Sequence, residues 1–149
     1  MISLMETRLS SIELYVTWVT NREDTQERYG RTFPQPLKQI LCWQKHNAVQ
    51  KYLKAVGLLE KTEAEIRQEI VDIYTCINQK LERNGGSVVG EVITEADVFV
   101  FGHLQAITES KLKRNILMTE LKNFPTLTKF CLNFNQIHMG VKGMIWDFL

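Results

Sequence analysis

One stretch decides the fold of this chain: residues 94–107, which read TEADVFVFGHLQAI. Thr94 is a favourable residue for the start of a helix, and Asp97 stands three positions later. This is the spacing of a capping box, in which two side chains satisfy backbone donors that a helix start leaves unpaired. Ile93 and Val98 have the spacing of a hydrophobic staple across the same cap. The next two turns contain no polar face, which predicts a helix surrounded by protein.

The segments on either side of this helix repeat apolar residues at helical spacing and do not alternate as strands do. Gly102 lowers helix propensity within the central helix, so we expect it to allow another helix to approach closely. The fold class is therefore all-α, a bundle of about six to seven helices. The other helices are expected at about 4–28, at 37–56, from Thr62 to Asn84, at 112–122 and from Pro125 onward.

Two local patterns make more specific predictions. Tyr29-Gly30 indicates the end of the first helix, because glycine can adopt the left-handed conformation that closes a helix. Thr62 and Glu65 have the spacing of a second capping box.

The last helix is expected to turn one apolar stripe inward, formed by Leu127, Phe130, Cys131, Phe134 and Ile137.

Length and composition limit the classes of protein that the chain can be. Its 149 residues, 44% of them hydrophobic, are enough for one domain with one core. We expect that domain at residues 1–138 and a C-terminal tail at residues 139–149. A net charge of +1 provides no broad field for a polyanion, so no nucleic-acid partner is expected. No signal peptide is recognisable, and the longest apolar stretch is far shorter than a bilayer requires.

No catalytic, cofactor-binding or metal-binding constellation is recognisable. His46, His103 and His138 do not pair at ligand spacing, so structural roles are expected, and His103 should be hydrogen-bonded in the core. The capping role accounts for Asp97 better than a general base would. The odd number and wide separation of the cysteines argue against disulfides and zinc; these are Cys42, Cys76 and Cys131.

Two segments are candidate contacts with a partner or a membrane. The basic stretch that contains Lys38, Lys45 and Lys51 fits either a solvated helix face or a contact with anionic lipid or an acidic partner. The apolar tail is as suited to packing on its own core as to binding a membrane or a partner. Its candidate contact residues are Ile145, Trp146, Phe148 and Leu149.

Several motifs carry resemblances to known families. The first pattern resembles the C-terminal helical domain of the glutathione transferase superfamily: Val88-Val89-Gly90-Glu91-x-x-Thr94-x-Ala96-Asp97, followed later by Phe124-Pro125-Thr126-Leu127. The second set is more specific and resembles the metaxin family, in its metaxin 2 type. It consists of Arg28-Tyr29-Gly30, Pro34-x-Pro36-Leu37, Ile40-Leu41, Gln44-Lys45, Lys54-Ala55-x-Gly57 and Glu95-x-Asp97-x-x-Val100-Phe101-Gly102-His103-Leu104.

The metaxin resemblance implies a non-enzymatic adaptor on the cytosolic face of the mitochondrial outer membrane. Such a protein acts with a metaxin 1 type partner in protein import and β-barrel assembly, and is attached peripherally through that partner. Two other functions stay open: an adaptor that links mitochondria to motor complexes, and a fragment of a glutathione transferase-like enzyme. The family has a thioredoxin-like half before the helical half, so we expect a short isoform or a truncated form. Apolar surface bared by the missing half predicts self-association.

Overall fold

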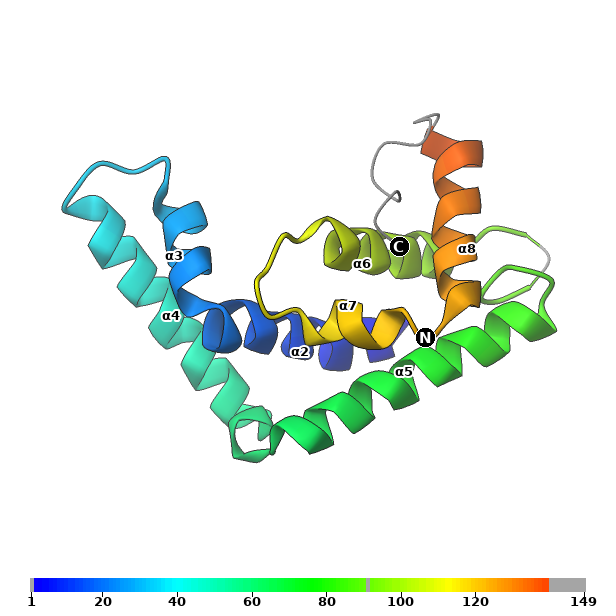
Figure 1. The fold of residues 1–149 in the computed structure, drawn as a ribbon, viewed down its shortest axis with the longest axis horizontal. Coiled ribbons are helices and arrows are strands. Elements are labelled where there is room, and N and C mark those ends of the chain that lie inside the picture. The colour runs from blue at the N-terminus through cyan, green and yellow to red at the C-terminus, as the bar shows by residue number, and fades with distance from the viewer. Residues whose placement is uncertain (1, 91, 140–149) are drawn as a thin grey trace.

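The computed structural model describes residues 2–90 and 92–139, and within these ranges every regular element is a helix (Figure 1). The all-α prediction is therefore confirmed. The chain begins with a continuous helical arm made of α1 (Ile2–Leu4), η1 (Met5–Leu9), α2 (Ser10–Tyr15) and η2 (Val16–Thr20), where η1 and η2 are turns of π-helix. Its apolar stripe is fully buried and includes Met5, Leu9, Ile12 and Val16.

The helix expected at 4–28 is interrupted at Asn21, whose backbone leaves helical geometry at φ −117° and ψ 42°. The Asn21 amide donates to the carbonyl oxygens of Val16 and Arg114, at 2.9 and 2.8 Å, and its oxygen accepts from the Arg114 N–H at 3.0 Å. These bonds hold the corner at which α3 (Arg22–Gly30) turns away from the arm (Figure 1). An asparagine that bonds to distant backbone gives no periodic signal in the sequence.

Gly30 is not the left-handed helix stop that we expected, because its φ is not positive. It is the last residue of α3, and a Cβ at this position would lie 2.5 Å from Cγ of Lys38. The glycine is therefore used to let the Lys38 stem cross the backbone closely. Lys38 belongs to α4 (Leu37–Ala55), which runs back along α3 to form a helical hairpin.

The next two elements follow the sequence pattern closely. Gly57 adopts the left-handed conformation, at φ 72°, and the chain then passes through η3 (Leu58–Glu60) into α5 (Glu63–Arg83). The capping box of Thr62 and Glu65 is present. The apolar stripe of α5 is buried: Ile66, Ile70, Ile73, Ile77 and Leu81. In Figure 1, α4 and α5 form the two arms of a V.

The remaining helices complete the core above α5 (Figure 1). They are α6 (Glu95–Glu109), α7 (Ile116–Leu121), α8 (Pro125–Phe134) and the π turn η4 (Asn135–Met139). The hydroxyl of buried Tyr74 on α5 donates to the carbonyl of Leu117 at 3.2 Å. Asn115 caps α7 by accepting from the Met118 N–H at 3.0 Å, so this helix begins later than its apolar pattern suggested.

Three packing predictions are wrong. The central helix α6 is not surrounded by the described protein, since Val98 is 53% exposed and Phe99 is also exposed. No atom lies within 4 Å of the position that a Cβ on Gly102 would take, so no helix of the described chain approaches it. Ile137 lies in the π turn η4 and is 72% exposed, so it is not an inward residue of the α8 stripe as predicted.

Candidate interaction surfaces

The capping pair lies at the junction between α6 and the loop before it. Asp97 is fully buried, and its Oδ2 accepts from both the N–H and the hydroxyl of Thr94, each at 2.8 Å. Its Oδ1 accepts from the N–H of Val88 at 2.6 Å. The carboxylate therefore closes the helix start and also holds the loop that arrives from α5. With both oxygens engaged by backbone and hydroxyl donors, Asp97 is a structural group.

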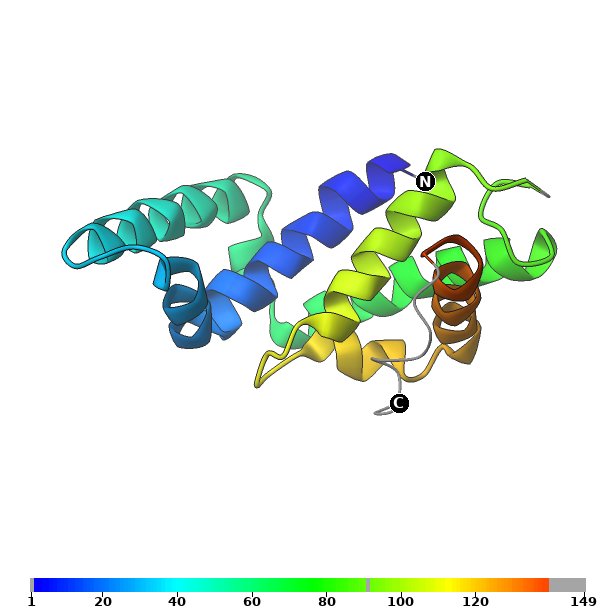
Figure 2. The same cartoon turned by 90° about the horizontal axis from the view of Figure 1, so that it is seen from above.

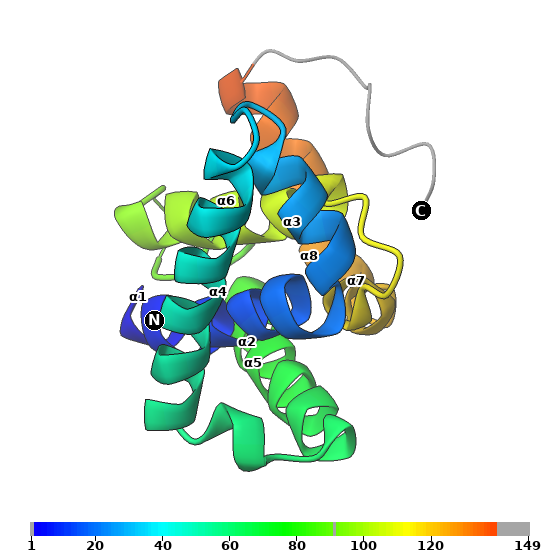
Figure 3. The same ribbon diagram turned by 90° about the vertical axis from the view of Figure 1, so that its left-hand side faces the viewer.

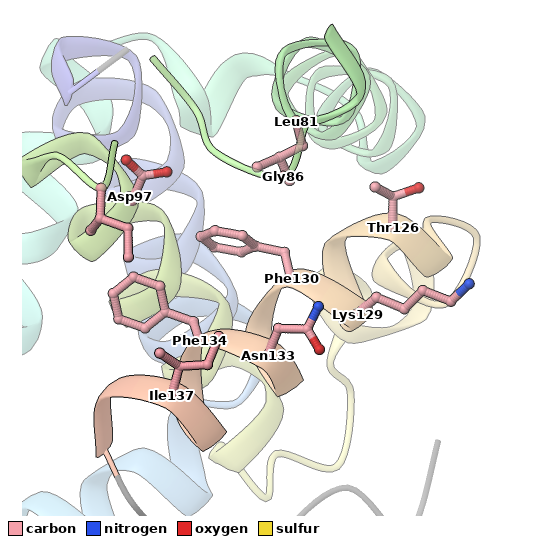
Figure 4. A pocket seen from close by; sticks show the side chains of 10 residues that line it. Leu81, Gly86, Asp97, Thr126, Lys129, Phe130, Asn133, Phe134 and Ile137 are labelled. Carbon is pink, nitrogen blue, oxygen red and sulfur yellow. The ribbon is translucent and has the colours of Figure 1, made fainter. Parts of the chain in front are cut away.

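A small apolar cavity of about 190 Å³ lies next to this junction (Figure 4). Phe130 and Phe134 of α8 project into it, and Leu81 closes its far side. Lys129 lies at the edge, and Figure 4 shows its amino group directed away from the aromatic rings. Apart from Asp97, whose oxygens are engaged, and Lys129 at the edge, the lining residues are uncharged, so the arrangement suits apolar packing.

The other side of α6 runs alongside the N-terminal arm (Figure 2). There Nδ1 of His103 lies 2.8 Å from a carboxylate oxygen of Glu13 on α2. This hydrogen bond raises the pKa of His103 against the opposing effect of burial, because the carboxylate stabilises the protonated ring. His103 is half-buried and hydrogen-bonded across two helices. Its environment explains the histidine without a metal or a substrate.

Around this pair, α6 presents an uncovered apolar strip, which we call the α6 face and define as Val98, Phe99, Gly102 and Ala106. With Glu13 and His103 it lines a shallow depression of about 400 Å³. An exposed strip of this kind on a helix is typical of a contact with another polypeptide. The sequence pattern does not reveal this strip, because an all-apolar start of a helix has the same residue types on its buried and on its exposed side.

The three candidate lysines of α4 do not form one face. Lys38 and Lys45 are separated by about two helical turns and lie on the same side, whereas Lys51 is six residues further on and lies on another side. Lys45 and Lys51 are exposed. Lys38 instead lines an open groove of about 650 Å³ between the end of α3 and the loop from α6 to α7.

We call this feature the basic groove and define it by its lining: Asp24, Glu27, Arg28, Arg31, Lys38, Lys111 and Lys113. It lies on the hairpin side of the molecule, which faces the viewer in Figure 3. The basic pattern of α4 points to Lys38 alone, because Arg28 and Arg31 belong to α3 and the turn after it, and Lys111 and Lys113 come from a segment far away along the chain. The run Lys111-Leu112-Lys113-Arg114 was the available signal.

The described residues offer little reactive chemistry elsewhere. Burial raises the pKa of the Cys131 thiol to about 12, so this cysteine stays protonated near neutrality. Desolvation lowers the pKa of His46, which is buried between α3 and α4. Within residues 2–90 and 92–139, no three metal-ligating side chains come together. The tail candidates Ile145, Trp146, Phe148 and Leu149 lie outside the described residues.

Among the helices of the described ranges, none combines the length and the hydropathy of a membrane span. This finding concerns only those helices.

Comparisons with known proteins give a consistent picture. The chain is similar to metaxin-2 of Homo sapiens, with 33% identity over 145 residues that cover 94% of this chain and 54% of the relative. Metaxin-2 of Mus musculus is 34% identical over 138 residues, covering 89% of this chain and 51% of the relative. Metaxin-1 of Mus musculus is 25% identical over 156 residues, covering 95% of this chain and 47% of the relative.

This chain thus spans about half the length of the curated relatives that it matches. No family model and no solved structure matches it. The resemblance to glutathione transferase C-terminal domains therefore stays a prediction, while the metaxin resemblance extends over nearly the whole chain. Because similarity to metaxin-2 covers about nine tenths of the sequence and exceeds that to metaxin-1, the chain belongs to the metaxin family and is of the metaxin 2 type.

Proposed function

We propose that this chain is a non-enzymatic adaptor at the cytosolic face of the mitochondrial outer membrane. In this proposal it binds a metaxin 1 type protein and contributes with it to protein import and β-barrel assembly. The observation that carries the proposal is the 33% identity to metaxin-2 across 94% of the chain. Two structural features support an adaptor. One is the exposed apolar strip on α6. The other is the lack, within the described residues, of a nucleophile that lies beside a general base.

The α6 face is the surface on which we expect the metaxin 1 type partner to bind. Val98 and Phe99 provide exposed apolar area. Gly102 has no side chain and Ala106 has a small one, so the surface of α6 is shallow at these positions. Because nothing lies within 4 Å of the Cβ position of Gly102, a partner helix has room to approach the backbone of α6. The ion pair of His103 and Glu13 forms a polar edge to the apolar strip.

Co-precipitation of the purified chain with a metaxin 1 type protein tests this assignment. We expect Val98→Glu to abolish most of the binding, because it places a charge in the centre of a desolvated contact. Val56→Glu is the matched control, since Val56 is similarly exposed but follows α4 on a different part of the molecule. If Val98→Glu and Val56→Glu both bound the metaxin 1 type protein as well as the unaltered chain does, the α6 face would not be the contact. Absence of binding by the unaltered chain would refute the proposed function itself.

The non-enzymatic part of the proposal has its own test. A fragment of a glutathione transferase-like enzyme should bind glutathione saturably, and titration calorimetry would detect the heat. We expect no heat above dilution, because the cavity beside Asp97 is lined mainly by apolar side chains, the Asp97 carboxylate is already engaged by Val88 and Thr94, and Lys129 is the one cation among the lining residues. A saturable signal would contradict the adaptor assignment.

A further inference from the structure

The basic groove concentrates charge that the whole chain does not have. Its lining contains five cations and two carboxylates, on a chain whose net charge is +1. The cations come from three places: the end of α3 with its following turn, the start of α4, and the loop between α6 and α7. Only the tertiary fold brings them together, at the hairpin side of the molecule (Figure 3).

The walls of the groove are fixed by contacts between α3 and the loop from α6 to α7. The Asn21 side chain, at the start of α3, forms two hydrogen bonds with the backbone of Arg114, at 2.8 and 3.0 Å. Lys113 pairs with Asp24 at 2.7 Å, and the Arg28 guanidinium donates to a backbone carbonyl of the same loop. The two walls are therefore held together before a partner arrives, which lowers the entropic cost of binding.

The start of α4 adds a further cation. The stem of Lys38 crosses the backbone of Gly30 so closely that a Cβ on the glycine would lie 2.5 Å from Cγ and 2.7 Å from Cε of the lysine. The Lys38 side chain thus lies across the end of α3, where it lines the groove. Any larger residue at position 30 would displace this stem.

Most of the positive charge in the groove is not compensated within the protein. Lys113 is neutralised by Asp24, whereas Arg28 bonds to an uncharged carbonyl and keeps its full charge. The side chains of the remaining three cations have no hydrogen-bond or ion-pair partner in the described part of the chain; these are Arg31, Lys38 and Lys111. The groove therefore keeps a positive field that is available to an anionic partner.

The shape and the lining of the groove narrow the kind of anion. Ile40 and Trp43 follow Lys38 by two and by five residues, which places these exposed apolar side chains on the roughly opposite side of α4. A bilayer at the groove would gain no apolar anchor from them, and its surface would have to enter a hollow between two walls. None of the described lining residues is aromatic, so the groove has no platform on which nucleic-acid bases could stack.

We propose that the basic groove binds an acidic segment of another protein. A polypeptide chain is narrow enough to enter the hollow, where its carboxylates pair with Arg31, Lys38 and Lys111. Asp24 and Glu27 in the same lining repel an evenly charged anionic surface, whereas a polypeptide places its carboxylates at intervals. The groove shares no lining residue with the depression at the α6 face, so this contact is separate from the one proposed for the metaxin 1 type partner.

Fluorescence anisotropy of labelled octaglutamate, titrated with the purified chain at low ionic strength, tests the proposal. We expect saturable binding of octaglutamate, no binding of octaglutamine, and weaker binding as salt is added, because salt screens exposed charges. Each exposed cation removed should weaken binding about threefold, so Arg31→Gln with Lys111→Gln should weaken it about tenfold. Failure of the unaltered chain to bind octaglutamate would overturn the proposal.

Lys51→Gln with Lys54→Gln is the matched control. It removes the same charge from exposed positions on the side of α4 roughly opposite to Lys38. We expect this pair to bind octaglutamate like the unaltered chain, and we expect both double variants to keep the circular dichroism spectrum and the melting temperature. Equal weakening by the two pairs would overturn the proposal, because net charge alone would then explain the binding.

A lipid contact is distinguished from a protein contact by cosedimentation with vesicles of phosphatidylcholine and phosphatidylserine. Sedimentation that depends on Arg31 and Lys111, together with no binding of octaglutamate, would assign the groove to a membrane and refute the proposal. The test of the proposed function is independent of this one. Arg31→Gln with Lys111→Gln should bind the metaxin 1 type protein like the unaltered chain, so either proposal can fail without the other.

Discussion

Asp97 has a larger part in the fold than a helix cap requires. Three donors converge on its buried carboxylate, and one of them is the Val88 N–H from the loop before α6. The cap at Thr62 and Glu65 uses the same spacing but is exposed and holds only its own helix. Two capping motifs of the same spacing thus contribute differently to the fold, because only the one at Asp97 is buried against a second segment.

We expect Asp97→Ala to lower the free energy of unfolding by about 2 to 4 kcal/mol. Loss of the cap contributes about 1 kcal/mol, and the buried Val88 N–H that loses its acceptor adds about 1 to 3 kcal/mol. Urea denaturation measures the change. Glu65→Ala is the control and should cost clearly less, because water can replace its exposed bonds. Equal losses in the two variants would contradict the role given to the loop contact.

The ion pair between His103 and Glu13 makes stability depend on pH. The pKa of His103 is raised in the folded protein above its ordinary value of 6.5, so the folded state binds the proton more tightly than the unfolded state. The stabilisation is complete below pH 6.5 and is lost as the pH rises through the folded pKa. Urea denaturation from about pH 5 to about pH 9 measures it. Glu13→Gln should remove this part of the pH dependence, and an unchanged profile would refute the pairing.

At the scale of elements, α6 combines a buried side and an uncovered side. Val100, Leu104 and Ile107 pack into the core, while Val98 and Phe99 face outward from the same turns. An isolated apolar sequence cannot show this division, because both sides consist of the same residue types. The pattern of α5 is easier to interpret because its polar residues mark the solvent side.

Substitution by alanine should change the stability of the protein in opposite directions at two glycines, Gly102 and Gly57. Gly102 lies exposed within α6 with nothing near its Cβ position, so Gly102→Ala should raise the free energy of unfolding by about 0.5 to 1 kcal/mol. Gly57 has a φ of 72°, so Gly57→Ala should lower it by roughly 1 to 2 kcal/mol. Thermal denaturation of the two variants tests the pair. Destabilisation by Gly102→Ala would indicate a contact that the described chain does not contain.

At the scale of the whole molecule, two separate apolar surfaces remain uncovered by the described residues. One is the α6 face, and the other is the outer side of α4 with Ile40 and Trp43. Exposed apolar strips of this kind favour association with other molecules. Our proposed function assigns the first to a protein partner. Both would be available in the isolated chain.

We therefore expect the purified chain to self-associate in the absence of partners. Sedimentation velocity should show a weight-average mass that rises with protein concentration. Phe99→Asp should shift the equilibrium toward monomer, because it places a charge on the α6 face. Val92→Asp, at an exposed apolar position before α6, is the control. A monomer at all concentrations would refute the expectation.

The sequence by itself determined the helical class, the capped start of α5 and the metaxin relationship. These depend on local spacing, on capping side chains and on motifs that are contiguous along the chain. The corner at Asn21, the reason for Gly30, the outward side of α6 and the basic groove were decided only by the tertiary structure. Each depends on how the helices pack, as when Lys38 crosses Gly30, or when Arg31, Lys38 and Lys111 meet at one groove. Local periodicity reports which residues share a helix side, but which side becomes covered depends on how the helices pack.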